Sequence, residues 1–222
     1  MFDANCLKLM FVAGSQDFYH IKGGKNDRIN ALLDTLESAL QSKITAFQFR
    51  QKGDLALQDP VEIKQLALEC QKLCQKYGVP FIVNDEAPLA LELKADGVHV
   101  GQEDMAIEEV ITLCKKRQFI GLSVNTLEQA LKARHLDGVA YLGVGPIFPT
   151  QSKKDIKQVV GVELLKKIKD SGVKKPLIAI GGITMHNASK LRECGISGIA
   201  VISAIAQAKD KALAIEKLLN DA

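Results

Sequence analysis

The sequence predicts an α/β protein, a single (β/α)8 TIM barrel formed by one domain over residues 1–222. Eight short apolar runs alternate with helical patterns, these units fill the chain, and no change of composition marks a domain boundary. Repeated strand-then-helix units indicate a parallel sheet, because each parallel crossover needs a long connection. An open doubly wound sheet is the alternative. The glycine-rich segments follow late strands and not the first, which favours the closed barrel.

The expected strands are apolar runs of strand length, bounded by polar residues or glycine. They cover residues 7–13, 44–49, 81–83, 97–100, 119–124, 140–144, 177–180 and 198–202. A helical pattern follows each run. The clearest has apolar residues at Ile29, Leu32, Leu33, Leu36 and Leu40, a spacing typical of an amphipathic helix. A shorter helix is expected over residues 87–93, between the third and fourth strands.

Composition excludes several classes of function. The net charge of +3 on a mixed surface gives no reason to expect nucleic acid or membrane binding. The chain has neither an apolar run of transmembrane length nor the pattern of a signal peptide, so a cytoplasmic protein is expected. Cys70 and Cys74 lie on an apolar helical stripe and are expected to be reduced core residues. Small-molecule substrates are the expected partners, and the sequence leaves a homo-oligomer open.

Two apolar runs lead to carboxylates, Asp85 and Asp104, beyond neighbouring strands. Parallel neighbours lie about 4.8 Å apart, so both carboxylates could reach one ion. Mg²⁺ typically takes one or two protein carboxylates and completes its shell with water and phosphate oxygens. The pair therefore indicates a magnesium site. The alternative is that each Asp caps the helix that follows it.

Polar side chains also follow the other early strands. Strand alternation puts Gln48, Arg50 and Lys52 on one side and Phe49 on the other, and two cations there indicate an anion site. A surface salt-bridge pair is the alternative. Other polar residues expected at the mouth are Asn84, His99 and Ser123, although Ser123 alone could be a cap and His99 a structural histidine.

Two later segments indicate phosphate chemistry. Residues 143–155 carry prolines, hydroxyls and lysines and are expected to form a lid, the alternative being a disordered surface loop. Gly181 and Gly182 follow the seventh strand, and the eighth runs into Ser203. In TIM barrels, phosphate is frequently bound between the loops after strands seven and eight. We therefore expect a phosphate site here, although a glycine pair can also simply make a turn.

With these motifs in place, the sequence resembles the thiamine phosphate synthase family. The resemblance covers most of the chain and rests on residues 48–52, 83–85, 95–104, 120–123, 143–153, 179–183 and 201–205. It implies a (β/α)8 enzyme that joins hydroxymethylpyrimidine diphosphate to hydroxyethylthiazole phosphate and releases pyrophosphate. It also implies Mg²⁺ as cofactor and a dissociative transfer in which diphosphate leaves first. No protein nucleophile is then needed, and the sequence shows no convincing Ser-His or Cys-His arrangement.

The resemblance assigns roles to matching positions. It places the pyrimidine diphosphate among Gln48, Arg50, Lys52, Asn84, Ser123 and Lys153, with Arg50 and Lys153 as catalytic residues. It places Mg²⁺ on Asp85 and Asp104, and the thiazole phosphate among Thr150, Ser152, Gly182, Ile202 and Ser203. The family's Thr-Pro-Thr-Lys lid is here Thr-Gln-Ser-Lys, at residues 150–153. Residues 15–27 match weakly and leave the role of that loop open.

Two other functions are compatible with the sequence. A thiazole tautomerase is a related barrel that keeps the phosphate site but has no need of the diphosphate and metal residues. A barrel that binds a thiamine precursor without catalysis is the second. The presence of Arg50, Lys52, Lys153 and both aspartates together favours the synthase.

Overall fold

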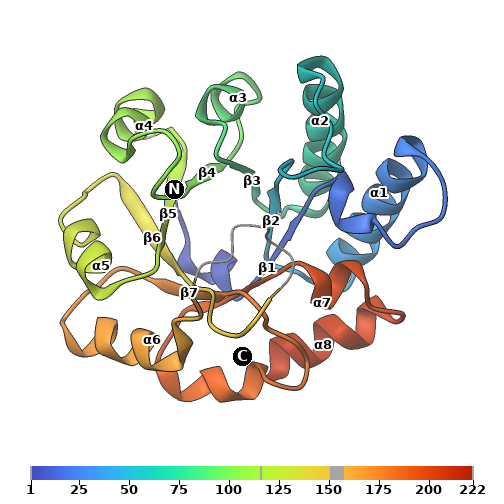
Figure 1. The fold of residues 1–222 in the computed structure, drawn as a ribbon. Coiled ribbons are helices and arrows are strands. Elements are labelled where there is room, and N and C mark those ends of the chain that lie inside the picture. Colours follow the sequence, from blue (N-terminus) through green and yellow to red (C-terminus); the bar gives the residue numbers. More distant parts are fainter. Residues whose placement is uncertain (1, 116, 151–157, 222) are drawn as a thin grey trace.

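The eight strands close into a barrel in which every strand is parallel to its neighbours (Figure 1). The computed structural model describes residues 2–115, 117–150 and 158–221. The strands are β1 (Leu9–Ala13), β2 (Ala46–Phe49), β3 (Phe81–Asn84), β4 (Gly97–Val100), β5 (Phe119–Val124), β6 (Val139–Val144), β7 (Leu177–Ile180) and β8 (Gly198–Val201). Pairing of Leu9 with Ile199 joins β1 to β8 and closes the sheet. The predicted barrel is confirmed, and the open sheet is wrong.

Small differences at the strand ends have local causes. The first strand begins at Leu9 and not at Leu7, because Leu7 ends the 3₁₀ helix η1 (Ala4–Leu7). The last strand ends at Val201, because Ile202 is the N-cap of the helix that follows. Both differences fall where a strand adjoins a helical turn, which an apolar run alone does not reveal.

Helices form a ring outside the barrel (Figure 1). The α-helices are α1 (Lys25–Gln41), α2 (Pro60–Tyr77), α3 (Ala87–Glu92), α4 (Ile107–Cys114), α5 (Leu127–Ala133), α6 (Gly161–Asp170), α7 (Ser203–Ala206) and α8 (Lys211–Asp221), with 3₁₀ helices η2 (Ser15–Phe18) and η3 (Ala188–Cys194). The ends of α2 show why these residues form a helix. Asp59 accepts from the Val61 amide, Pro60 fits the first turn, and Gly78 ends the helix in the left-handed region.

A 3₁₀ helix, η3, takes the place of the expected seventh α-helix. Asn187 stands at its N-cap position but makes no side-chain capping bond to it. The Asn187 side chain instead donates to the Gly182 carbonyl and accepts from the Thr184 amide. The residue that could start a regular helix thus supports the glycine turn after β7.

Strand alternation divides the core into two parts. Side chains such as Phe11, Phe47 and Phe81 pack between the barrel and its helices, whereas Met10 and Tyr141 fill the barrel interior. Burial of the interior side chains closes the barrel to passage of solvent. Cys70 and Cys74 are buried free thiols on α2, as expected.

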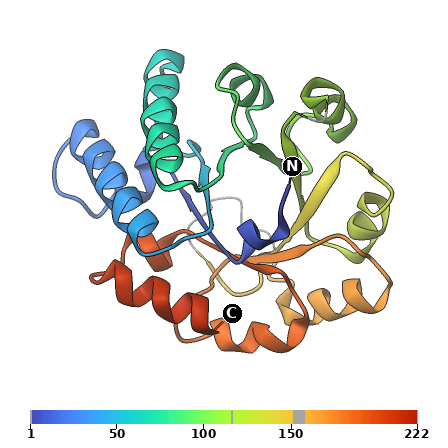
Figure 2. The same cartoon turned by 180° about the vertical axis from the view of Figure 1, so that it is seen from behind.

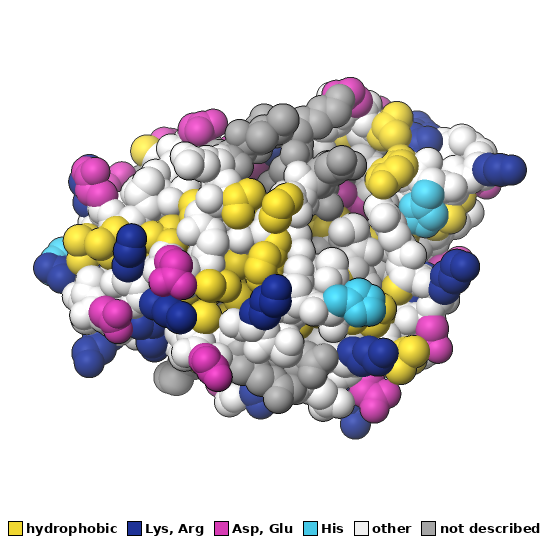
Figure 3. Space-filling model, turned by 60° about the horizontal axis from the view of Figure 1, so that its bottom comes forward, with side chains coloured by type: hydrophobic (Ala, Val, Ile, Leu, Met, Phe, Trp, Pro, Cys, Tyr) yellow, Lys and Arg dark blue, Asp and Glu magenta, His cyan; other side chains and the backbone are white. Residues whose placement is uncertain are grey.

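The N-terminal segment closes the end of the barrel at which the strands begin (Figure 2). The Phe2 ring lies 5.1 Å from Phe119 and 6.3 Å from Tyr141, measured between ring centroids. Ligands therefore have to approach from the opposite end, where the strands finish. On the face of the molecule that Figure 3 shows, acidic and basic side chains are interspersed with apolar ones. Among the helices described by the structure, none is long and apolar enough to cross a membrane.

Candidate functional site

A cavity of about 260 Å³ opens at the C-terminal ends of the strands. A water molecule occupies about 30 Å³ in the liquid, so the cavity has room for a small organic molecule. The residues assigned by resemblance that line it are Arg50, Lys52, Asn84, Asp85, Asp104, Ser123, Thr150, Gly182, Ile202 and Ser203. Gln48 lies below this lining, buried in the barrel interior. Ser152 and Lys153 lie outside the described residues, so their roles stay predictions.

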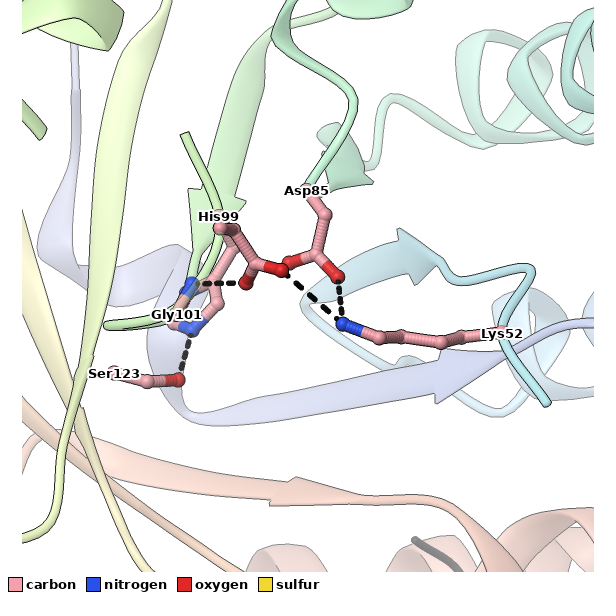
Figure 4. A network of polar contacts seen from close by, with 6 residues as sticks. Lys52, Asp85, His99, Gly101 and Ser123 are labelled. Carbon is pink, nitrogen blue, oxygen red and sulfur yellow. Dashed lines mark hydrogen bonds and ion pairs between the residues drawn. The ribbon is translucent and has the colours of Figure 1, made fainter. Parts of the chain in front are cut away.

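The two carboxylates face one cation (Figure 4). Lys52 Nζ lies 2.9 Å from Asp85 Oδ2 and 3.1 Å from Asp104 Oδ1. Asp85 and Asp104 come from the loops after β3 and β4, and Lys52 from the loop after β2. Three consecutive strand ends thus bring two negative charges and one positive charge together.

Backbone contacts aim both carboxylates at the mouth. Asp85 has a left-handed φ of 65°, which Asp tolerates better than most residues, and its amide donates to the His99 carbonyl at 2.8 Å. One Asp104 oxygen accepts from the Gly101 amide at 2.8 Å, leaving the other for Lys52. The helix-cap reading is wrong for both, because the N-caps of α3 and α4 are Glu86 and Ala106.

Burial and proximity make the two carboxylates unequal. Burial, with the hydrogen bond to Asp104, raises the pKa of Asp85 despite the opposing effect of Lys52. Burial also acts to raise the pKa of Asp104, but hydrogen bonds with Asp85, the Gly101 amide and Lys52 outweigh it and lower that pKa. Burial acts to lower the pKa of Lys52, but the two carboxylates outweigh it and raise that pKa. A cation between the carboxylates is therefore favoured.

The donor set fits a magnesium ion that takes part of its shell from a ligand. Both carboxylates already share a cation, and carboxylate oxygens are the protein donors that Mg²⁺ prefers. Within residues 2–115, 117–150 and 158–221, no cluster of three or more His, Cys, Asp or Glu side chains is placed to hold a metal. A metal on this pair would need further oxygens from water or from a bound phosphate.

Arg50 supplies a second cation to the cavity and is held from two sides. Its amide donates to the Ala13 carbonyl, and its carbonyl accepts from Gln16 Nε2 at 2.7 Å. Gln16 lies on η2, in the loop whose role the sequence left open. One function of that loop is thus to fix the backbone of Arg50. Tyr19 in the same loop is 61% exposed and bonds to Gln207.

The opposite wall of the cavity is the glycine turn after β7. Gly181 and Gly182 have φ values of 96° and 66°, which favour glycine. The Gly181 carbonyl accepts from the Phe148 amide at 3.0 Å, so the loop after β6 is attached to this turn. A Cβ at Gly182 would stand 2.6 Å from the Phe148 carbonyl oxygen and would also clash with that of Pro149. The glycine therefore lets this loop lie close to the turn.

His99 lines the cavity, at the mouth position expected from the sequence, where a structural histidine was the alternative. Its Nε2 lies 2.8 Å from Ser123 Oγ and its Nδ1 lies 2.9 Å from Tyr141 Oη (Figure 4 shows the first contact). The sequence shows no convincing Ser-His pair of nucleophile and base, and the structure adds a hydrogen-bond contact between His99 and Ser123. Strand alternation is the sequence feature that indicates this contact, because His99 and Ser123 both fall on inward positions of their strands.

Eight parallel strands with a cavity that charged side chains line at their C-terminal ends define a (β/α)8 barrel of the enzyme type, since active sites of such enzymes lie at this end. The family model described as thiamine monophosphate synthase matches residues 18–205. The thiamine-phosphate synthase of Helicobacter pylori (strain ATCC 700392 / 26695) is 91% identical over 222 residues, covering 100% of both chains. That of Pasteurella multocida (strain Pm70) is 51% identical, covering 97% of this chain and 96% of the relative.

A solved structure agrees with these relatives. The thiamine phosphate pyrophosphorylase from Pyrococcus furiosus superposes with a TM-score of 0.81 at 35% identity, covering 98% of this chain and 96% of that one. The chain therefore belongs to the thiamine phosphate synthase family and is a transferase of thiamine biosynthesis.

Proposed function

We propose that the protein transfers the pyrimidinylmethyl group of hydroxymethylpyrimidine diphosphate to the ring nitrogen of hydroxyethylthiazole phosphate, releasing pyrophosphate. The observation that carries this proposal is the division of one cavity into two ends. Arg50, Lys52 and the carboxylate pair lie at one end, and the glycine turn lies at the other. Family membership supports this reaction, and the arrangement of the cavity supports a separate site for each anionic substrate.

The cationic end is suited to the departing diphosphate. In the proposed step the bond between the methylene carbon and the diphosphate oxygen breaks, and its electron pair stays on oxygen. Arg50 and Lys52 oppose the negative charge that grows there, and Lys153 is proposed to join them from the lid. A magnesium ion held by Asp85 and Asp104 would add charge stabilisation at the same oxygens.

The thiazole phosphate is proposed to bind at the glycine turn. Gly182, Ile202, Ser203 and Thr150 line that end, and Ser152 is proposed to join them. Anchoring the phosphate there holds the thiazole nitrogen toward the methylene carbon. The nitrogen lone pair then forms the new C–N bond, which needs no covalent bond to the protein.

Incubation with both substrates and magnesium separates the synthase from its two rivals. The proposed function predicts thiamine phosphate and pyrophosphate in equal amounts. A tautomerase would isomerise a thiazole phosphate without coupling it, and a binding protein would leave both substrates unchanged. Either of these results from folded protein would reject the proposed function.

Replacing Lys52 should separate metal binding from catalysis. In the Lys52→Met variant the two carboxylates lose their shared cation, so Mg²⁺ should bind the ligand-free protein several-fold more tightly. Each part-exposed ion pair typically contributes about 0.2–1 kcal/mol, which sets this scale. Turnover should nevertheless fall, because a cation facing the diphosphate is lost. Calorimetric titration with magnesium measures the first effect.

Lys64→Met is the matched control, because Lys64 pairs with Glu92 on the outer helices, away from the cavity. It should change neither magnesium affinity nor turnover. If Lys52→Met left the magnesium affinity at the parental value, the proposed competition between lysine and metal would be wrong.

A further inference from the structure

A chain of polar side chains lies inside the barrel, directly beneath the cavity. It runs from Tyr141 on β6 through His99 on β4 to Ser123 on β5, with Gln48 on β2 beside Tyr141. Gln48, Tyr141 and His99 are 3%, 0% and 7% exposed, whereas Ser123 reaches the cavity wall. Buried polar groups are costly unless they are bonded, and here Tyr141 bonds to His99, His99 bonds to Ser123, and Gln48 donates to Met10 Sδ.

Two glycines make room for this chain. Gly121 stands between His99 and Tyr141 in the sheet register, and a Cβ there would overlap both side chains. Gly143 is paired with Ser123, and a Cβ there would stand 3.0 Å from His99 Cε1. Interior positions of a TIM barrel are usually filled by bulky residues. Two interior positions are therefore glycine in place of a bulky residue, and the side chains of His99 and Tyr141 occupy the space.

The direction of each hydrogen bond follows from the donors available. Burial raises the pKa of Tyr141 far above its usual range, so the phenol keeps its proton. Gln48 acts to lower the pKa of Tyr141 against the larger effect of burial, so its amide nitrogen, which donates to Met10 Sδ at 3.4 Å, is the part of Gln48 turned toward the phenol oxygen. The phenol hydrogen is then directed at His99 Nδ1.

A neutral histidine that accepts at Nδ1 carries its hydrogen on Nε2. His99 Nε2 therefore donates to Ser123 Oγ, 2.8 Å away. With its oxygen accepting from His99, the Ser123 hydroxyl points its own hydrogen toward the cavity. His99 has no lone pair facing the serine in this arrangement, so it cannot take the serine proton as the base of a nucleophilic pair does.

We infer that Tyr141 and His99 are positioning residues that hold Ser123 as a hydrogen-bond donor toward the ligand. The site at Ser123 then takes a hydrogen-bond acceptor, such as an unprotonated ring nitrogen, and disfavours a ring that presents a donor there. Identifying this ring with the pyrimidine substrate rests on the proposed function. The proton arrangement does not depend on it.

The first test reads the histidine tautomer without any substrate. The chain has four histidines, so ¹⁵N-histidine labelling gives few ring signals, and His99→Asn identifies the signals of His99. The parent should show His99 as neutral with hydrogen on Nε2. In Tyr141→Phe the donor to Nδ1 is lost, and the signals should move toward the Nδ1–H form. An imidazolium or an Nδ1–H histidine in the parent would overturn the inference.

The second test is a double-mutant cycle on turnover. Tyr141→Phe keeps the ring volume and should lower kcat/KM about tenfold, since the histidine can then accept from Ser123 and draw its hydrogen away from the ligand. The same change made in a Ser123→Ala background should have almost no further effect. Full, additive losses would mean that Tyr141 acts only through packing and would overturn the inference.

Tyr77→Phe is the matched control, because its hydroxyl bonds to Glu37 on the outer helices. It should leave turnover and the His99 signals unchanged. If the parent protein makes no thiamine phosphate, the proposed function fails while the tautomer result still stands. The two failures are therefore distinguishable.

Discussion

Asp85→Asn and Asp104→Asn should each lower the rate of thiamine phosphate synthesis by on the order of a hundredfold. Losing one anionic ligand weakens the metal and with it the stabilisation of the departing diphosphate. Donors that stabilise such charge typically contribute about 3 kcal/mol each, which corresponds to this rate. Asparagine keeps the side-chain shape and also tolerates the left-handed backbone at Asp85. Steady-state turnover across a magnesium titration measures the effect.

Asp59→Asn is the control for these variants. Asp59 caps α2 outside the cavity, and Asn caps helices equally well, so turnover and melting temperature should stay parental. The thiazole phosphate should still bind both site variants, because its proposed site lies across the cavity. Parental rates at low magnesium in either site variant would contradict the shared-metal assignment.

Gly182→Ala should weaken binding of hydroxyethylthiazole phosphate at least tenfold. Alanine at a φ of 66° is strained by roughly 1–2 kcal/mol. Here the added methyl also meets the carbonyl oxygens of Phe148 and Pro149. The loop after β6 must move away, taking Thr150 with it. The first conflict of the added methyl is therefore with this loop. Calorimetry with the thiazole phosphate measures the loss.

Gly78→Ala isolates the backbone effect. Gly78 has the same φ of 66°, with no atom within 4 Å of an added Cβ, and it ends α2 away from the cavity. It should lower the melting temperature without changing thiazole phosphate affinity. Unchanged affinity in a folded Gly182→Ala protein would remove the glycine turn from the binding site.

The strands and the acidic pair could be predicted from the sequence because both depend on short segments. Apolar runs set the strands, and residues just beyond a run lie at the mouth once the sheet is parallel. Asp85 and Asp104 follow neighbouring strands, so their proximity needed no further information. Their shared contact with Lys52 depends on a loop conformation that no periodic pattern encodes.

The buried hydrogen-bond chain could not be predicted in the same way. His99 and Tyr141 are separated by 42 positions, and they meet only because Gly121 lies between them in the register. A run of apolar residues does not fix which positions of three strands face one another. Gln48 is a second example. Strand alternation correctly predicted the face of the sheet on which its side chain lies, but not that the side chain lies below the cavity.

Diphosphate and magnesium are proposed to bind together between the cations and the carboxylate pair. Titrating the protein with pyrophosphate, with and without magnesium, tests this claim. We predict that magnesium tightens pyrophosphate binding strongly in the parent and only weakly in Asp85→Asn and Asp104→Asn. Equal pyrophosphate affinity in the parent with and without magnesium would contradict the claim.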